Sequence, residues 1–154
     1  MSEARRTPVQ LRNIDPPSII ANVKKQKEAT MRAPLIACVD DDASVREALQ
    51  GFLLAFNFEV VTFASAESFL ASNSIDSVSC LITDVRLGGM SGLQLQKSLI
   101  ARGRLIPTIV ITAFSENGFR ESAMENGAVA MLLKPITANK LLAAVNTALN
   151  RGKA

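Results

Sequence analysis

Residues 35–42 have the sequence LIACVDDD, five apolar residues followed directly by three aspartates. A short apolar run of this kind, bounded by polar residues, is typical of a β-strand that is buried on both faces. Aspartate is also a preferred residue at the start of a helix, because its carboxylate accepts hydrogen bonds from free backbone N–H groups. The stretch therefore predicts a buried strand over 35–39 and a helix that begins near Asp42.

The same alternation of a short apolar run and a helical pattern repeats along the rest of the chain. Four further strands are expected at 58–62, 78–83, 107–111 and 129–133. The expected helices cover 42–56, 66–72, 92–102, 116–126 and 138–150. Five β–α units of this kind predict an α/β fold, with a parallel sheet, right-handed crossovers and helices on both faces.

Reactive side chains follow four of the five expected strands. Asp40 and Asp41 come after the first strand, Asp84 after the third, Thr112 after the fourth and Lys134 after the fifth. Ligands of open parallel sheets bind beyond the carboxyl ends of the strands, so we expect these groups at one edge. Taken alone, each group has an ordinary structural explanation, such as an acidic helix cap or a turn aspartate. Their convergence on one edge favours a functional site.

The composition limits the class of protein. A length of 154 residues and an apolar content of 48% suit one globular domain with its own core. No apolar run approaches the roughly 18 residues that a membrane span requires, and no secretory signal is visible. The two cysteines, Cys38 and Cys80, fall inside apolar strands. This placement predicts buried, reduced thiols in a cytoplasmic protein rather than a disulfide framework or a metal cluster.

The beginning of the chain differs from the rest in charge and periodicity. The first 34 residues contain seven Lys or Arg and three acidic residues, a net charge of +4, whereas the remainder carries −1. We therefore expect a basic tail over 1–33 that is disordered or weakly helical, followed by a domain over 34–154. Within the tail, 18–29 is the segment best suited to a short helix, and Met31 is an alternative translation start. Such a tail can contact nucleic acid or anionic lipid, but a solvated extension is the more usual case.

Four segments together resemble the receiver domains of two-component response regulators. They are VDDD at 39–42, LITDVRL at 81–87, IVITA at 109–113 and the dipeptide Lys134-Pro135. Their order and spacing match over about residues 35–150, and the sequence around Phe69 is most similar to the FixJ-type subgroup. The resemblance implies a flavodoxin-like (CheY-like) fold, with a five-stranded parallel sheet in the order 2-1-3-4-5 and helices on both faces.

The resemblance also implies a phosphorylation site. Asp84 would be the phosphoacceptor, Thr112 would donate its hydroxyl to a phosphoryl oxygen, and Lys134 would contact the same group. The implied metal site consists of Asp40, Asp41, Asp84 and Arg86. Mg²⁺ suits such a site because carboxylates that repel one another favour a hard divalent cation. The resemblance implies that the phosphoryl donor is a phosphohistidine on a sensor histidine kinase. The chain itself has no histidine and cannot supply that donor.

The short segment after the Lys134-Pro135 motif bears on how the protein is expected to signal. Only 20 residues follow Lys134, which predicts a stand-alone receiver without an output domain. It would signal through contacts with an unidentified downstream protein, with no direct DNA binding and no membrane association. No enzymatic activity is expected beyond its own phosphorylation and dephosphorylation. The resemblance permits a homodimer through the face formed by the segments 116–126, 129–133 and 138–150.

Two positions depart from the receiver pattern. Gly88 stands where receivers commonly have proline, which predicts a more flexible loop after Asp84. Met131 stands where an aromatic switch residue is common. We interpret it as a core residue, and we expect weaker coupling between Asp84 and the outer face because methionine has no ring to swing.

Two alternative functions stay open at this point. A pseudo-receiver would be an interaction module that takes no phosphoryl group, and the intact Asp84, Thr112 and Lys134 argue against it. An aspartyl-type phosphohydrolase would use the same nucleophile. Such enzymes usually carry a second acid two residues further on, where this chain has Arg86.

Overall fold

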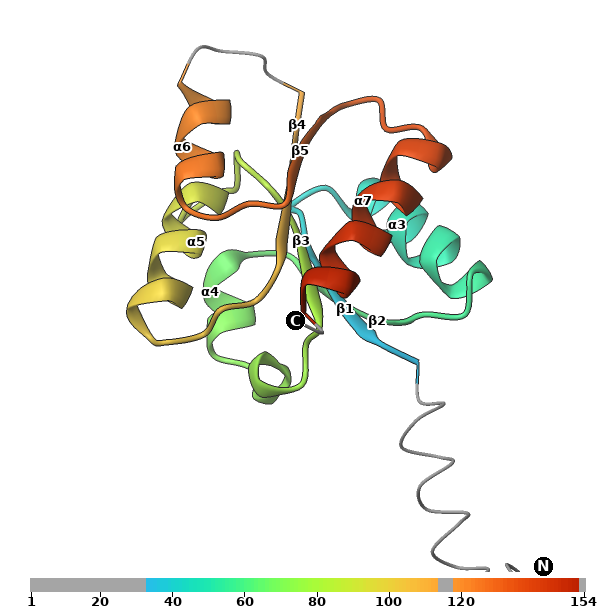
Figure 1. Ribbon diagram of the computed structural model, residues 1–154, viewed down its shortest axis with the longest axis horizontal. Coiled ribbons are helices and arrows are strands. Elements are labelled where there is room, and N and C mark those ends of the chain that lie inside the picture. The colour runs from blue at the N-terminus through green and yellow to red at the C-terminus, as the bar shows by residue number, and fades with distance from the viewer. Residues whose placement is uncertain (1–32, 114–117, 153–154) are drawn as a thin grey trace, which may run out of the picture. The chain divides into compact units, whose positions relative to one another are not determined.

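A computed structural model describes residues 33–113 and 118–152, which all belong to the unit Ala33–Ala154 (Figure 1). The tail predicted over 1–33, its short helix and the start at Met31 fall on residues outside this description, except for Ala33, and they stay predictions. Within the described residues, no helix combines the length and the apolar character needed to cross a bilayer.

Strands and helices alternate along the described residues, as the sequence pattern predicts. The strands are β1 (Leu35–Val39), β2 (Glu59–Phe63), β3 (Cys80–Asp84), β4 (Thr108–Thr112) and β5 (Ala130–Leu133). The helices are α3 (Ala43–Ala55), α4 (Ala66–Leu70), α5 (Gly92–Ala101), α6 (Phe119–Glu125) and α7 (Ala138–Gly152), with a 3₁₀ helix, η1 (Asn73–Asp76), before β3. The pattern does not predict η1, which is a single short turn.

The five strands form one parallel sheet in the order β2-β1-β3-β4-β5. This order confirms the flavodoxin-like topology that the resemblance implies. β1 and β3 are adjacent, with Val39 opposite Thr83. The residues that follow these two strands therefore emerge side by side at the carboxyl edge.

Three strands end one residue later than the apolar pattern predicts: β2 ends at Phe63, and β3 and β4 each end at a polar residue. Asp84 belongs to β3, where it is the register partner of Ile111, and Thr112 belongs to β4, where it is the partner of Leu133. The ladder continues because backbone pairing does not depend on whether a side chain is apolar. Both polar side chains are thus fixed by the sheet rather than by a loop.

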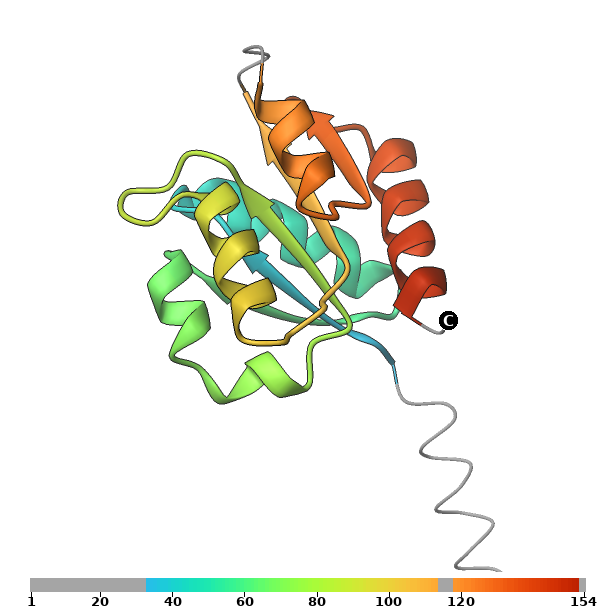
Figure 2. The ribbon, with the colours of Figure 1, turned by 60° about the vertical axis from the view of Figure 1, so that its left-hand side comes forward.

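Helices cover both faces of the sheet (Figures 1 and 2). α3 and α7 lie on one face, and α4, α5 and α6 lie on the other. On the first face, Leu53 and Val145 join a fully buried cluster with Ile82; on the second, Phe69 packs in a cluster with Leu81. Neighbouring residues of β3 point to opposite faces, as expected for a strand. Coverage on both sides explains why the strands are almost entirely apolar.

Side-chain caps fix where the helices near the carboxyl edge begin. Asp42 accepts a hydrogen bond from the Ser44 N–H at 2.8 Å and caps α3, as predicted. Ser65 caps α4, and Ser91 forms a capping box with Gln94 at the start of α5. The caps supply partners for N–H groups that the first turn of each helix leaves unpaired.

Both cysteines are core residues. Cys38 and Cys80 are free thiols with no exposed surface, in adjacent strands of the sheet. Burial raises the pKa of both thiols to about 12, so neither forms a reactive thiolate at neutral pH. The prediction of buried, reduced cysteines agrees with this placement.

Candidate functional site

Four strand ends bring polar groups to the carboxyl edge of the sheet. Asp40 directly follows β1, Asp84 ends β3, Thr112 ends β4 and Lys134 directly follows β5. The strands are parallel, and β1, β3, β4 and β5 are consecutive in the sheet. These groups therefore lie at the carboxyl edge, where ligands of open parallel sheets bind.

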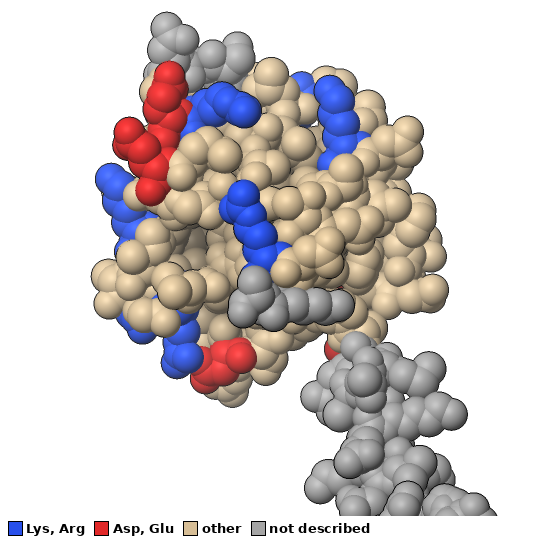
Figure 3. Space-filling model, viewed as in Figure 1, with Lys and Arg blue, Asp and Glu red and all other residues tan. Residues whose placement is uncertain are grey.

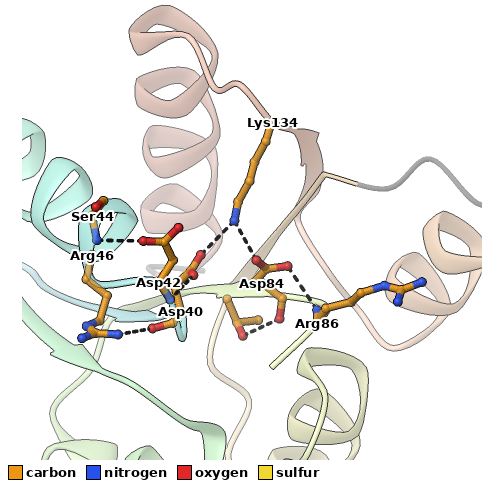
Figure 4. A network of polar contacts seen from close by, with 8 residues as sticks. Asp40, Asp42, Ser44, Arg46, Asp84, Arg86 and Lys134 are labelled. Atoms are coloured by element: carbon orange, nitrogen blue, oxygen red, sulfur yellow. Dashed lines mark hydrogen bonds and ion pairs between the residues drawn. The ribbon is translucent and has the colours of Figure 1, made fainter. Parts of the chain in front are cut away.

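The ammonium group of Lys134 lies between two aspartates (Figure 4). Its Nζ donates to Oδ2 of Asp84 at 2.7 Å and to Oδ2 of Asp40 at 3.1 Å. The exposed fraction of the side chain is 0% for Asp40, 10% for Asp84 and 22% for Lys134. Two shielded carboxylates thus share one ammonium.

Asp40 is held from three sides. Its Oδ1 accepts from the Asp42 N–H at 2.9 Å, its Oδ2 faces Lys134, and its carbonyl oxygen accepts from Nη1 of Arg46 at 2.6 Å. Burial raises the pKa of the Asp40 carboxyl and the charge of Asp84 adds to the rise, against the opposing effect of the Asp42 and Lys134 hydrogen bonds. A buried acid whose charged form is disfavoured in this way gains from a bound cation.

Lys134 keeps its charge in this setting. Burial by itself lowers the pKa of the ammonium group, but the hydrogen bonds to Asp84 and Asp40 outweigh burial, and the pKa lies above its usual value. The backbone N–H of the same residue donates to the carbonyl oxygen of Thr112 at 2.8 Å. Lys134 is therefore anchored both by its side chain and by its backbone.

The two carboxylate oxygens of Asp84 have different partners. Oδ2 faces Lys134, and Oδ1 accepts from the backbone N–H of Arg86 at 3.1 Å. Figure 4 shows the Arg86 side chain leading away from this carboxylate. The carbonyl oxygen of Asp84 accepts from Oγ1 of Thr83 at 3.0 Å. The carboxylate is thus oriented by one backbone donor and one ammonium.

Thr112 and Asp41 occupy contrasting positions. Thr112 is fully buried at the end of β4, next to the strand that carries Asp84. Asp41 is exposed in the turn between β1 and α3. The structure therefore holds Asp40, Asp84 and Lys134 in direct contact, with Thr112 in the adjacent strand and Asp41 at the solvent side.

The donor groups at this edge fit Mg²⁺. Among residues 33–113 and 118–152, no three Asp, Glu, Cys or His side chains form a ready group of metal ligands. Mg²⁺ does not require one, because it usually keeps several waters and binds through one or two carboxylates together with phosphate oxygens. Asp40 and Asp84 supply hard carboxylate oxygens with only one ammonium between them, and Asp41 is exposed beside them.

Gly92 contributes to the site for a reason that the sequence patterns do not give. A Cβ at this position would overlap the carbonyl oxygen of Asp84. Its N–H also donates to the carbonyl oxygen of Val85 at 2.9 Å. Only glycine lets the first turn of α5 approach the end of β3 so closely. The available signal was a glycine directly after the capping Ser91, because glycine is otherwise unfavourable in a helix.

The structure shows the surroundings of Gly88 and Met131, the two positions that depart from the receiver pattern. At Gly88 the backbone is not left-handed, and nothing lies within 4 Å of an added Cβ. Met131 is partly buried against a cluster that includes Val110 and Ala123, which agrees with its interpretation as a core residue. The more flexible loop and the weaker coupling stay predictions.

Comparison with known proteins adds sequence evidence. The family model of the response regulator receiver domain matches residues 36–146. The chain is 39% identical over 124 residues to the transcriptional regulatory protein TdiR of Thauera aromatica, which covers 80% of this chain and 55% of that protein. It is 40% identical over 126 residues to nodulation protein W of Bradyrhizobium diazoefficiens. The aligned part covers 82% of this chain and 55% of that protein. The chain thus spans about half the length of the curated relatives it matches.

A solved structure agrees with these relatives. The crystal structure of FixJ-N superposes with a TM-score of 0.71 at 34% identity, covering 78% of this chain and 96% of that chain. The match agrees with the similarity to the FixJ-type subgroup noted in the sequence. Together with the strand order and the residues gathered at the carboxyl edge, these matches show that the chain belongs to the response regulator receiver domain family.

Proposed function

We propose that this receiver is the phosphoacceptor of a two-component phosphorelay, phosphorylated on Asp84 by a sensor histidine kinase with Mg²⁺. Membership of the family supports a role in two-component signalling and a histidine kinase as partner. The observation that carries the proposal is the contact of Lys134 with both Asp84 and Asp40 at the carboxyl edge. It gives the acceptor carboxylate a fixed orientation and a permanent positive neighbour.

In the proposed step, a carboxylate oxygen of Asp84 attacks the phosphorus of the donor. The new O–P bond replaces the N–P bond of a phosphohistidine, and the imidazole leaves with the bonding electron pair and takes a proton from solvent. Lys134 would contact the arriving phosphoryl oxygens, and Thr112 would donate its hydroxyl to one of them. Mg²⁺ would be held by the carboxylates of Asp40, Asp41 and Asp84 and by the backbone carbonyl oxygen of Arg86, because a guanidinium cannot ligate a cation. It would offset the negative charge of the transferring group.

We propose that output passes through protein contacts of this domain rather than through direct DNA binding or turnover of a separate substrate. Large apolar side chains are exposed on the face formed by α6, β5 and α7, with Met124 38% and Leu133 53% exposed. Basic side chains on the face shown in Figure 3 are spaced apart, some of them beside acidic ones, and do not form a stripe. Such a surface suits a downstream protein or a second copy of this chain.

Intact-mass analysis after incubation with acetyl phosphate and Mg²⁺ tests the proposal. The parent should gain the mass of one PO₃ group, and the gain should be lost with a chelator and in Asp84→Ala. An unmodified parent would contradict the proposal and favour an interaction module that takes no phosphoryl group. Equal modification of Asp84→Ala would place the acceptor elsewhere, and release of many phosphate equivalents from a generic ester would identify a phosphohydrolase instead.

A further inference from the structure

The loop between Asp84 and α5 contains two adjacent glycines, Gly88 and Gly89. Its ends are tied together, because the Gly92 N–H donates to the carbonyl oxygen of Val85 at 2.9 Å. Neither Gly88 nor Gly89 has a left-handed φ, so the path of the backbone does not require glycine at either position. Two glycines in succession nevertheless give the loop many alternative conformations.

Glu67 of α4 contacts the middle of this loop. Its Oε2 accepts a hydrogen bond from the Met90 N–H at 2.8 Å. A Cβ added at Gly89 would lie 2.6 Å from the same oxygen and 3.2 Å from Cδ of Glu67, whereas one added at Gly88 would meet nothing within 4 Å. Gly89 therefore leaves the space that the Glu67 carboxylate occupies, and Gly88 has no such role.

The contact is made by a charged group. The hydrogen bond from the Met90 N–H, together with the backbone N–H of Glu67 itself, lowers the pKa of the Glu67 carboxyl. At neutral pH the acceptor is thus a carboxylate, which forms a stronger hydrogen bond than a neutral acceptor. The same loop carries Arg86, whose N–H orients the Asp84 carboxylate at 3.1 Å.

We propose that Glu67 is a positioning residue for the phosphoacceptor, because it holds the 85–91 loop in the conformation that keeps the Arg86 N–H on Asp84. The proposal rests on the proposed function of Asp84. Glu67 would supply, from a neighbouring helix, the restraint that proline gives in receivers that have it at the position of Gly88. Gly89 then leaves room for the Glu67 carboxylate in this contact.

Four substitutions separate this role from a general effect on the loop. Glu67→Ala removes the carboxylate, and Glu67→Gln keeps an acceptor oxygen without the charge. Gly89→Ala displaces the carboxylate by steric overlap. Gly88→Ala is the matched control, because it adds the same methyl group one residue earlier, where it contacts nothing. Circular dichroism would confirm that each variant is folded.

The rate of phosphorylation by acetyl phosphate with Mg²⁺ is the first readout. Glu67→Ala and Gly89→Ala should each slow the reaction about twofold, the factor at the low end for one net hydrogen bond, because this one is exposed to solvent. Glu67→Gln should lie closer to the parent, and Gly88→Ala should react at the parent rate. Gly89→Ala should have little further effect when Glu67 is already alanine, because both changes remove the same contact.

Amide NMR signals provide a readout that does not depend on phosphorylation. The Met90 and Arg86 amide shifts should move together in Glu67→Ala and Gly89→Ala. In the parent, the Met90 shift should change at a pH below the ordinary pKa of glutamate, and this step should be absent in Glu67→Gln.

Two results would overturn the proposal. One is a Glu67→Ala variant in which the Met90 amide shifts but the Arg86 amide and the phosphorylation rate do not change. The other is a Gly88→Ala variant that reacts as slowly as Gly89→Ala. If the parent accepts no phosphoryl group, the proposed function fails separately, and the amide shifts alone then decide whether Glu67 positions the loop.

Discussion

The site has two parts that are held in place by different means. Asp40 and Asp84 stand at the ends of adjacent strands and share the Lys134 ammonium, with almost no exposed surface. The 85–91 loop is held by the hydrogen bond between its ends and by the exposed carboxylate of Glu67. The first part depends on pairing within the sheet and the second on single polar contacts, so equally small substitutions should affect the two parts by very different amounts.

The largest effect on stability is expected where the two parts meet, at Gly92. Alanine at this position would overlap the Asp84 carbonyl oxygen, so either the end of β3 or the first turn of α5 would have to move. We expect Gly92→Ala to lower the free energy of unfolding by about 3 kcal/mol, measured by urea denaturation.

Gly51→Ala is the control for this substitution. Gly51 lies at an exposed position inside α3, with nothing within 4 Å of an added Cβ. Alanine is favoured over glycine in a helix by about 1 kcal/mol, so this variant should be more stable than the parent. Parent-like stability of Gly92→Ala would show that the strand end is not fixed as described.

A smaller effect is expected on the stabilisation by Mg²⁺, which should differ between substitutions at the neighbouring acids Asp40 and Asp42. The parent should be stabilised by about 2.7 kcal/mol at a Mg²⁺ concentration of 100 times its dissociation constant. Asp40→Asn should reduce this gain. Asp42→Asn should keep it, because asparagine caps a helix as well as aspartate does and Asp42 acts as the cap of α3. An equal response of both variants in thermal denaturation would remove Asp40 from the metal site.

The pH dependence of stability tests the part of the site at the strand ends, formed by Asp40, Asp84 and Lys134, in the absence of metal. Burial raises the folded-state pKa of Asp40, so the folded protein binds a proton more tightly than the unfolded chain does. Ionised Asp40 therefore lowers stability at neutral pH, and this cost disappears as pH falls through the raised pKa toward the ordinary value of 3.8. Asp40→Asn should be more stable than the parent at pH 7 and should lose that advantage in acid, as measured by urea denaturation at both pH values. A difference that does not vary with pH would contradict the assignment.

The smallest effect is expected on the outer face. Met131 is partly buried against a cluster that includes Ala123 of α6, and it has no aromatic ring. Because its side chain is flexible, it should transmit little of the structural change that phosphorylation of Asp84 causes. Met131→Phe should change stability little, because Met131 is only partly buried, and it should enlarge the amide shifts that a beryllofluoride mimic produces on α6, β5 and α7. Equal shifts in parent and variant would show that the ring is not needed for coupling.

The part of the site at the strand ends could be predicted from the sequence. Apolar runs mark the strands, and parallel strands place their carboxyl ends at one edge, so the presence of Asp40, Asp84 and Lys134 at the same edge follows from their positions in the sequence. The strand order itself came from the resemblance, because periodicity does not specify which strands are neighbours.

The contacts of the loop could not be predicted in this way. Glu67 lies 23 residues from Met90 in the sequence, and their hydrogen bond depends on the path of a loop with two glycines. Gly92 gave a detectable signal, a glycine behind a helix cap. The close approach of Gly92 to the Asp84 carbonyl oxygen depends on the direction in which α5 leaves the edge of the sheet, which the sequence does not specify.

The central claim is that Asp84 accepts a phosphoryl group at the edge where Lys134 and Asp40 meet it. Sodium borohydride reduces an aspartyl phosphate to homoserine, which remains in the chain and can be located by peptide mass mapping. After treatment with a phosphodonor and Mg²⁺, we predict homoserine at position 84 and at no other aspartate. Homoserine at Asp41 or Asp42, or peptides that are unmodified throughout, would contradict the claim.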